Sequence, residues 1–168
     1  MKDYRFCPFC KGSFVEKHLE GHARNVCRKC GWIAYKNPLP AVSCLVSNPK
    51  NELLLIKRGI EPYKGAWCIP GGFVEMNETL REAAQRELVE ETGVSGKAGR
   101  FVGAYIQKSR MYGAVMIVGI ELTAKSSRVK AGDDAEDARF FPFKHLPEIP
   151  LESHRNLIKD YLHLKRKA

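Results

Sequence analysis

The sequence lacks any long apolar run. Hydrophobic residues make up 44% of the 168 residues, yet no stretch approaches the roughly 20 consecutive apolar residues that a membrane-spanning helix needs. An apolar signal peptide is also missing, since residues 1–5 lead straight into a cysteine motif. We therefore expect neither a membrane span nor secretion, and we expect a cytoplasmic location.

Acidic residues are in short supply. The chain has 19 Asp and Glu against 28 Lys and Arg, which gives a formal net charge of +9. Much of the excess lies in residues 1–36 and in the tail 165–167. Such a field attracts polyanions, among them nucleotides and RNA. The alternative is that these charges serve solubility alone.

Four of the six cysteines form two CxxC pairs near the start, separated by sixteen residues. Cys7 and Cys10 make the first pair, and Cys27 and Cys30 make the second. This spacing is typical of a structural Zn²⁺ site with four protein ligands and no open position. Disulfides are the alternative, but the missing secretory signal disfavours them.

The residues around these cysteines predict a zinc ribbon of short strands at 14–19, 25–26 and 32–35. His18 and His22 lie between the pairs and could replace a ligand. Because four cysteines already suffice, we interpret them as surface residues. A ribbon this small needs its metal to fold. Its basic residues permit nucleic-acid binding without establishing it. A stiff Asn-Pro-Leu-Pro connector follows, which divides the chain into a ribbon at 1–36 and a second domain at 37–168.

The rest of the chain is organised around residues 72–94. Pro70, Gly71 and Gly72 predict a tight turn in which the backbone approaches another group closely. A helix should follow, with Asn77 as N-cap and Gly93 at its end. A 100° step per residue places three apolar residues on the side of Leu80, which we expect to pack on the body of the protein. They are Ala83, Ala84 and Leu88.

Glu87, Glu90 and Glu91 fall on this same side of the helix. Three carboxylates on a face that should be buried repel one another and lose hydration. A cation among them resolves this conflict, and carboxylate oxygens suit Mg²⁺ or Mn²⁺. The alternative is a solvated acidic helix end with Arg86 and Lys97 as loose partners.

The spacing of this stretch resembles the Nudix box at every defined position. Gly72 is followed after five residues by Glu78, and after seven more by the run Arg86 to Val94. The resemblance implies a metal-dependent hydrolase that cleaves the pyrophosphate bond of a nucleoside diphosphate linked to another group. It implies that the three box glutamates hold the metal, that Glu78 pairs with Arg86, and that the Gly72 carbonyl also reaches a metal.

Further elements follow from patterns of apolar residues and turns. Strands are expected at 41–47, 52–58, 67–69, 100–109, 114–122 and 139–141, and an amphipathic helix at 153–164 with Ser153 as N-cap. Mixed strands between helices imply an α-β-α sandwich of the α+β or α/β class. The Nudix resemblance implies the same fold. Cys44 and Cys68 lie outside the zinc pattern and are expected to be buried small hydrophobes.

A second acidic cluster spans the expected loop 130–137. Nudix enzymes often take a metal ligand or the catalytic base from such a loop, and we nominate Asp134 first and Glu136 second. A solvated loop is the alternative. Arg58 is a candidate for the substrate phosphates, with simple surface charge as its alternative. Tyr105 and Tyr112 are candidates for stacking on the base.

The substrate is left open between several nucleotides. A zinc ribbon before a Nudix domain resembles the NADH pyrophosphatases and the ADP-ribose-type hydrolases. The SQPWPFPxS-like array of the first group is absent, and no proline occurs between Val94 and Pro142, where the second group often has one. Tyr112 lies where dinucleoside polyphosphate hydrolases often have a tyrosine.

Two further alternatives concern partners. The chain resembles zinc-ribbon Nudix proteins that are commonly dimers, so a homodimer joined through the ribbon is one expectation. A ribbon that binds RNA or protein on a Nudix scaffold is the competing class, and removal of a nucleotide cap from RNA combines the two. The intact box favours the enzyme.

Overall fold

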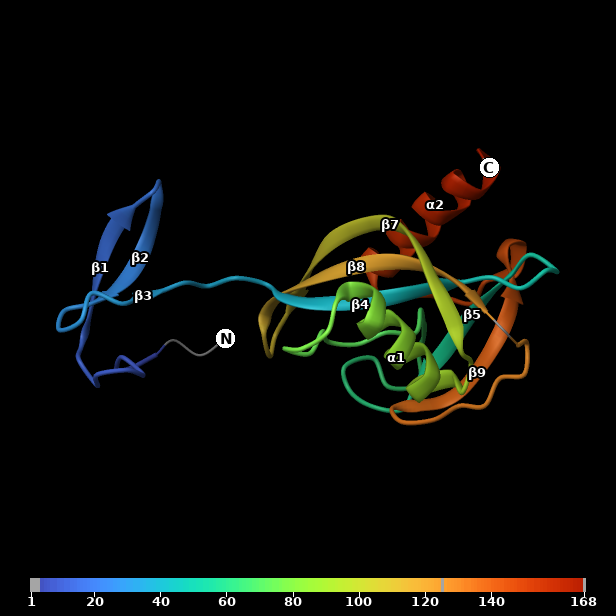
Figure 1. Ribbon diagram of the computed structural model, residues 1–168, viewed down its shortest axis with the longest axis horizontal. Helices are drawn as coiled ribbons and strands as arrows, with labels where there is room; N and C mark the ends of the chain where they lie inside the picture. Colours follow the sequence, from blue (N-terminus) through green and yellow to red (C-terminus); the bar gives the residue numbers. More distant parts are fainter. Residues whose placement is uncertain (1–3, 125, 168) are drawn as a thin grey trace.

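The computed structural model describes residues 4–124 and 126–167. Figure 1 shows a small three-stranded sheet, joined by an extended segment to a larger body that holds both helices. The small sheet consists of β1 (Phe14–Leu19), β2 (His22–Cys27) and β3 (Ile33–Ala34). The body consists of β4 (Leu39–Val46), β5 (Glu52–Arg58), β6 (Trp67–Cys68), α1 (Leu80–Thr92), β7 (Gly96–Ser109), β8 (Gly113–Ala124), β9 (Ala135–Pro142), a 3-10 turn (Phe143–His145) and α2 (Glu152–Arg166).

The small sheet is built on a tight hairpin. Glu20 and Gly21 connect β1 to β2, and both have positive φ, of 52° and 78°. Two such residues make the type I′ turn that matches the twist of antiparallel strands. β3 adds to the other side of β2. The three strands agree with the expected ribbon.

The body contains a mixed sheet of order β4-β8-β7, in which β4 runs parallel to β8 and β7 runs antiparallel to it. A second, antiparallel sheet has the order β6-β5-β9. The strands agree with the expected ones, apart from the starts of β7 and β9. β9 begins at Ala135, so Glu136 and Asp137 lie on a strand and not in the loop that the sequence suggested.

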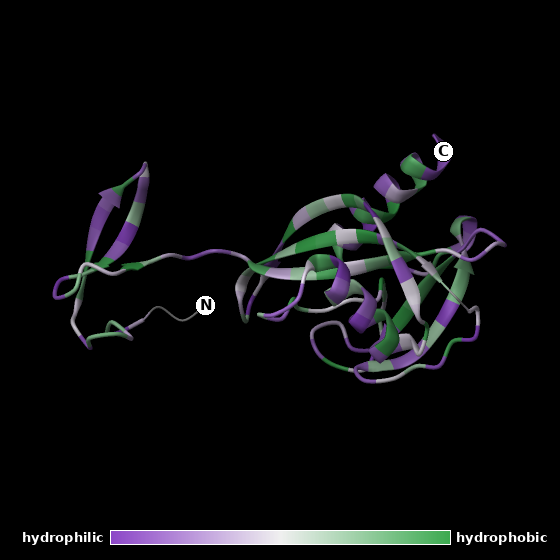
Figure 2. Ribbon diagram, in the orientation of Figure 1, coloured by the Kyte–Doolittle hydropathy of each residue, from purple (hydrophilic) through white to green (hydrophobic). Residues whose placement is uncertain are grey.

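Alternate residues of β4 face two separate hydrophobic cores, as the two-residue period of a strand requires. Ala41 and Leu45 pack with α2, whereas Val42, Cys44 and Val46 pack with α1. The apolar strands of the body are the green ribbons of Figure 2. The expected α-β-α sandwich with a mixed sheet is therefore confirmed.

The closing helix lies close to the sheet because two glycines face it. Gly103 and Gly119 are partners in the β7–β8 register. A Cβ at Gly119 would lie 2.6 Å from a methyl of Leu157. α2 begins after Leu151, so the prediction of Ser153 as N-cap is wrong. Ser153 lies inside the helix and donates a hydrogen bond of 3.0 Å to Gln107 on β7.

Helix α1 starts two residues later than expected. Thr79 is the N-cap, and it forms a capping box with Glu82 that satisfies two backbone N–H groups. The prediction of Asn77 as N-cap is wrong because this reciprocal pair decides the start. Leu80 is 38% exposed and does not join the core. Gly93 ends the helix with φ of 65°, as expected.

Within the described part of the chain, neither helix has the length and apolar character that crossing a bilayer requires.

Candidate functional site

The loop before α1 lies against the backbone of β4. The Cys44 N–H donates to the Pro70 carbonyl at 2.7 Å, and the Val42 N–H donates to the Gly72 carbonyl at 2.8 Å. Gly71 has φ of 150°, and a Cβ there would collide with the Val42 carbonyl oxygen. The turn therefore requires glycine at position 71 for both conformation and space.

Two box glutamates pack onto this loop. Glu87 is 8% exposed, and a Cβ on Gly72 would lie 2.6 Å from its carboxyl carbon. Glu91 is 4% exposed, and its Oε2 accepts a hydrogen bond of 2.7 Å from the Gly71 N–H. The carboxylates of Glu87 and Glu91 therefore lie directly against the loop backbone at Gly72 and Gly71, where no side chain separates them.

Arg86 connects three carboxylates, those of Glu78, Glu87 and Glu90. Its Nη2 donates to Glu78 Oε1 at 2.6 Å and its Nε donates to Glu78 Oε2 at 3.1 Å, a bidentate pair. Its Nη1 donates to Glu87 at 2.7 Å and to Glu90 at 2.8 Å. Nη2 also reaches the Phe73 carbonyl at 3.0 Å. One guanidinium therefore joins the loop at Phe73, Glu78 ahead of the N-cap, and the helix itself.

The electrostatics of the site reflect burial of negative charge. Burial raises the pKa of Glu91 to about 8, with a further rise from Glu87 and an opposing effect of the Gly71 N–H. Burial also raises the pKa of Glu87, against the stabilising effect of Arg86. The hydrogen bonds from Arg86 lower the pKa of Glu78. The two buried carboxyls are thus destabilised as anions and need more positive charge than Arg86 supplies.

This donor set fits a hard divalent cation by its chemistry. Its groups are all oxygen ligands, from Glu87, Glu90, Glu91 and the Gly72 carbonyl, which Mg²⁺ and Mn²⁺ prefer. The three carboxylates do not converge on one point, because Glu87 and Glu90 turn to Arg86 and Glu91 turns to Gly71. A cation has to compete with these internal donors. The side chain of Glu90 is 44% exposed, although its carboxylate is paired with Arg86 at 2.8 Å.

The second acidic segment lies at the end of α1. The Gly132 N–H donates to the Glu91 carbonyl at 3.1 Å, and the charge of Asp134 raises the pKa of Glu91. The charge of Asp133 raises that of Glu87. Asp133 was not singled out from the sequence, where adjacent aspartates of a loop look alike. Glu136 is exposed and lies beside Gly59, toward the end of β5.

The other candidate residues lie in different places. The positive charge of Arg58 lowers the pKa of Glu91. The Nε of Arg58 donates a hydrogen bond of 2.9 Å to the Pro62 carbonyl. Tyr112 packs edge-on against Phe73 of the loop, with ring centroids 5.1 Å apart. Tyr105 points to α2, where its hydroxyl donates to Asp160 at 2.6 Å, and it lines a cavity of about 380 Å³ between β7 and α2. Tyr112 therefore lies beside the loop, whereas Tyr105 lies beside α2.

His154 supports the loop from α2, and sequence reasoning missed it. Its Nδ1 accepts a hydrogen bond of 3.1 Å from the N–H of Ile69, the residue before the Pro-Gly-Gly turn. Burial lowers the pKa of His154 to about 3. A single histidine in an amphipathic helix carries no signal of such a role.

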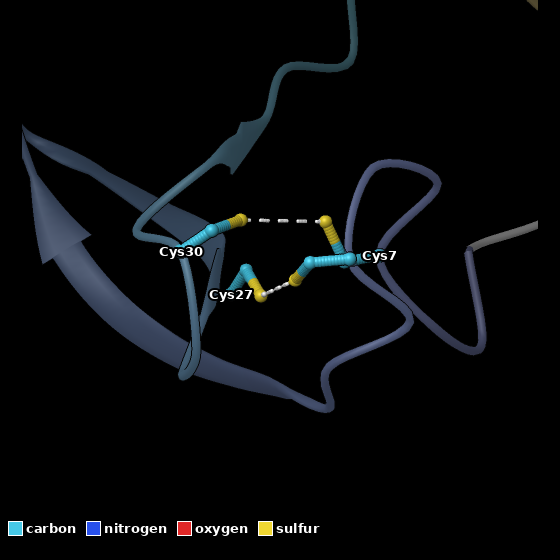
Figure 3. Close-up of side chains that lie close together, drawn as sticks. Cys7, Cys27 and Cys30 are labelled. Atoms are coloured by element: carbon cyan, nitrogen blue, oxygen red, sulfur yellow. Dashed lines mark hydrogen bonds between the residues drawn. The ribbon is translucent and has the colours of Figure 1, made fainter.

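The four ribbon cysteines lie together (Figure 3). Cys7 and Cys30 sulfurs are 3.6 Å apart, those of Cys10 and Cys27 are 3.4 Å apart, and all four lie within 4.8 Å of one another. Zinc–sulfur bonds of about 2.3 Å in a tetrahedron give sulfur separations of about 3.8 Å, so the set fits Zn²⁺. A hydrogen bond from the Cys30 backbone lowers the pKa of Cys27 to about 6, which favours the thiolate that binds metal.

Comparisons with known proteins identify the larger body. Residues 37–162 match the NUDIX domain. The chain belongs to the Nudix family. It is 40% identical over 132 residues to a protein named ADP-ribose pyrophosphatase from Methanocaldococcus jannaschii, which covers 78% of this chain and 77% of that protein.

Two further relatives extend the Nudix match toward the start of the chain. A NUDIX hydrolase of Nitrosomonas europaea has a crystal structure with a TM-score of 0.77 and 30% identity, covering 97% of this chain and 93% of that one. The NAD-capped RNA hydrolase NudC of Haemophilus influenzae is 31% identical over 157 residues, which are 89% of this chain. This chain spans only 56% of that protein's length. The expected family is therefore confirmed, together with its reaction class, the cleavage of pyrophosphate bonds in nucleoside diphosphate derivatives.

Proposed function

We propose that this protein uses Mg²⁺ or Mn²⁺ to hydrolyse the pyrophosphate bond of ADP-ribose or a closely related nucleoside diphosphate derivative and releases a nucleoside monophosphate. One observation carries the proposal: two buried glutamates, Glu87 and Glu91, lie against the bare backbone of Gly71 and Gly72. The 40% identity to a protein named ADP-ribose pyrophosphatase supports the choice of substrate.

In this proposal Glu87, Glu90, Glu91 and the Gly72 carbonyl hold the catalytic metal. A metal held by these groups would supply Lewis-acid chemistry, by lowering the pKa of the attacking water and offsetting negative charge on phosphate oxygens. Arg86 and Glu78 position the loop on the helix, because their bidentate pair joins the segment before α1 to its second turn. The protein's share of the work is positioning and electrostatic stabilisation, as is usual for reactions at phosphorus.

Other groups have roles around this centre. Asp134 is our first candidate for the general base and Glu136 the second, and the charge of Asp134 on Glu91 supports this order. Asp133 joins them because of its effect on Glu87. Arg58 is assigned to the substrate phosphates because its charge acts on the same carboxylate as Asp134 does.

The two tyrosines are assigned to the base of the substrate. Tyr112, packed on Phe73, offers a ring beside the loop. Tyr105 offers a ring at the cavity next to α2. Only one of the two positions can hold the base of a single substrate molecule, so substitution of each tyrosine by leucine distinguishes them by its effect on KM.

The proposal also includes the organisation of the chain. We assign residues 1–36 to a ribbon held by structural Zn²⁺ on Cys7, Cys10, Cys27 and Cys30, and residues 37–168 to the catalytic domain. The separate sheet of β1–β3 supports this division. The free cysteines fit a reducing compartment, for which we propose the cytoplasm, and the ribbon remains our candidate surface for a homodimer.

A second candidate function is removal of an NAD cap from RNA. The match to NudC, which covers 89% of this chain, favours it as an alternative. The active-site residues are the same in both cases, so the substrate and not the chemistry separates them.

The test is a substrate panel of ADP-ribose, NADH, NAD⁺, diadenosine polyphosphates and NAD-capped RNA, with Mg²⁺ and with Mn²⁺. Products are identified by mass, and Glu90→Gln protein serves as the control for contaminating activity. Metal-dependent AMP from ADP-ribose supports the proposal. Turnover of capped RNA alone supports the alternative, and no turnover by folded, zinc-loaded protein would overturn both.

A further inference from the structure

Two cations lie directly opposite each other on the ribbon. Lys17 of β1 pairs with Arg24 of β2 in the antiparallel register, so both side chains stand on the same face of the sheet. Like charges in this position destabilise a hairpin. Neither residue forms an ion pair with any described residue. A hairpin with this arrangement gains stability when an anion lies between the two cations.

Arg24 is held in place by an aromatic ring rather than by an acid. Its guanidinium lies 5.0 Å from the centre of the Tyr35 ring, just beyond β3. Its Nε is a buried nitrogen that has no hydrogen-bond partner in the described part of the chain. The buried Nε cannot reach an incoming ligand, but the two Nη groups donate to no described residue. A guanidinium that is oriented by stacking and has such free Nη groups is suited to a phosphate.

Exposed rings accompany these cations. Phe9 is 74% exposed, Phe6 is 55% exposed and Tyr35 is 49% exposed. The first of these touches Trp32, with centroids 5.3 Å apart, so it contributes to the small ribbon core. Even so, most of its surface faces solvent. Burial in the ribbon therefore does not account for these rings.

The net positive charge of the ribbon favours a negatively charged partner. Residues 4–36 contain seven Lys and Arg but only two acidic residues, Glu16 and Glu20. In Figure 2 the hairpin of β1 and β2 is largely hydrophilic and lies apart from the catalytic body. An acidic peptide would match the charge but would leave the rings unexplained. Phosphates together with bases match both, because single-stranded nucleic acids are bound by cations along the backbone and aromatic rings under the bases.

We propose that the ribbon face carrying Lys17 and Arg24 binds the phosphodiester backbone of a single-stranded nucleic acid, and that Tyr35 stacks on one of its bases. This function goes beyond the hydrolysis proposed above and does not depend on it. It gives the ribbon a binding role in addition to its zinc-dependent fold.

The test is fluorescence anisotropy of the zinc-loaded 168-residue protein with a short single-stranded RNA that carries a 3′ label and a 5′-hydroxyl. This probe has no pyrophosphate, so its binding is independent of whether the hydrolase proposal holds. DNA of the same sequence distinguishes the two sources of such a strand. A polyglutamate peptide of equal charge tests the acidic-peptide alternative.

The variant Lys17→Gln/Arg24→Gln removes the paired cations, and Lys144→Gln/Lys159→Gln, at exposed positions of the body, removes the same net charge elsewhere. We expect the ribbon variant to weaken binding about tenfold or more and to reduce the salt slope by about 1.4, since each phosphate contact on a single strand contributes about 0.7. The body variant should bind within about twofold of the wild type.

Tyr35 is tested by a pair of substitutions. Tyr35→Phe keeps the ring and should retain binding, whereas Tyr35→Leu should lose several-fold. Zinc content is measured for every variant to show that the ribbon is folded. Equal loss in the two double variants, equal binding of polyglutamate, or no binding of either oligonucleotide by zinc-loaded protein would overturn the proposal.

Discussion

Glu91 reaches back from the last turn of α1 to the Gly71 N–H, and this hydrogen bond of 2.7 Å closes the loop onto the helix that follows it. The same carboxylate is buried and has a pKa raised to about 8. Glu91 therefore accepts a structural hydrogen bond and also provides the negative charge that we propose for metal binding. Substitutions can separate these two roles.

Glu91→Gln should keep the fold and lose most turnover. The amide oxygen of glutamine still accepts from Gly71, but the anionic charge for the metal is gone. We expect kcat to fall about 100-fold or more, because several kcal/mol of charge stabilisation depend on the bound metal. Glu90→Gln should behave alike, since its exposed side chain contributes little to stability. Rates are measured at saturating Mg²⁺, together with Tm.

The control for both variants is Glu75→Gln, at an exposed position of the same loop. It removes one negative charge near the site without touching the proposed ligand set, so its rate should match the wild type. A near wild-type rate for Glu90→Gln at saturating Mg²⁺ would remove that residue from the ligand set.

Neighbouring glycines should fail in different ways. A Cβ at Gly71 collides with the Val42 backbone, which cannot move away cheaply, so Gly71→Ala should cost about 3 kcal/mol of stability. A Cβ at Gly72 meets the flexible end of Glu87 instead. Gly72→Ala should therefore cost within about 1 kcal/mol but should displace a proposed ligand and raise the Mg²⁺ requirement.

Urea denaturation and Mg²⁺ titration of activity check this pair of predictions. Each glycine variant serves as the control for the other. An unstable Gly72→Ala protein, or a Gly71→Ala protein as stable as the wild type, contradicts the packing described for this loop.

The sequence was sufficient to predict the elements that have a regular local pattern. The buried apolar runs of β4 and β5 were sufficient to predict strands of the sandwich, and the fixed spacing of the glutamates was sufficient to nominate the residues of the candidate site. The start of α1 was misplaced because Asn77 and Thr79 are both good caps, and only the return contact of Glu82 favours Thr79. Local helix-capping propensity does not distinguish Asn77 from Thr79.

Contacts between distant segments were out of reach. His154 meets Ile69 across 85 positions of sequence, and Asp133 is recognised only by its field at Glu87. Tyr105 and Tyr112 were both nominated to stack on the base, and the sequence alone did not place either ring. They differ because one contacts Asp160 on α2 and the other contacts Phe73 on the loop.

Acid should weaken the protein through His154. Its pKa is about 3 in the folded state against an ordinary value of 6.5, so the unfolded chain binds more protons between these values. The contribution to stability is complete above pH 6.5 and is lost as the pH falls, by about 1.4 kcal/mol for each unit. Urea denaturation from pH 7.5 down to pH 5 measures this slope.

The matched variants are His154→Asn and His163→Asn on the same helix. Asparagine at 154 keeps an acceptor for the Ile69 N–H but does not titrate, so its acid slope should be shallower than that of the wild type. His163 is exposed and should leave the slope unchanged. Glu91 is present in all three proteins, so the effect of its raised pKa cancels in the comparison. Identical slopes for both variants would show that His154 is not the group responsible.

Removal of zinc should unfold the ribbon and leave the catalytic domain folded. Neither hydrophobic core of the body includes a residue of β1, β2 or β3, so α1 and the sheets around it do not need the ribbon for their packing. The ribbon itself is small, so we expect it to depend for its fold on the Zn²⁺ that we propose for its four clustered cysteines.

Hydrogen exchange with mass spectrometry, before and after chelation, measures this difference. We expect loss of protection in residues 14–34 and unchanged protection in α1 and β8. Cys27→Ser should reproduce the effect without a chelator, whereas Cys68→Ala, which removes a buried thiol outside the ribbon, should retain zinc at the wild-type stoichiometry. Loss of protection in α1 on chelation would mean that the two parts fold as one unit, and full protection of β1 and β2 without zinc would mean that the metal is not what holds the ribbon.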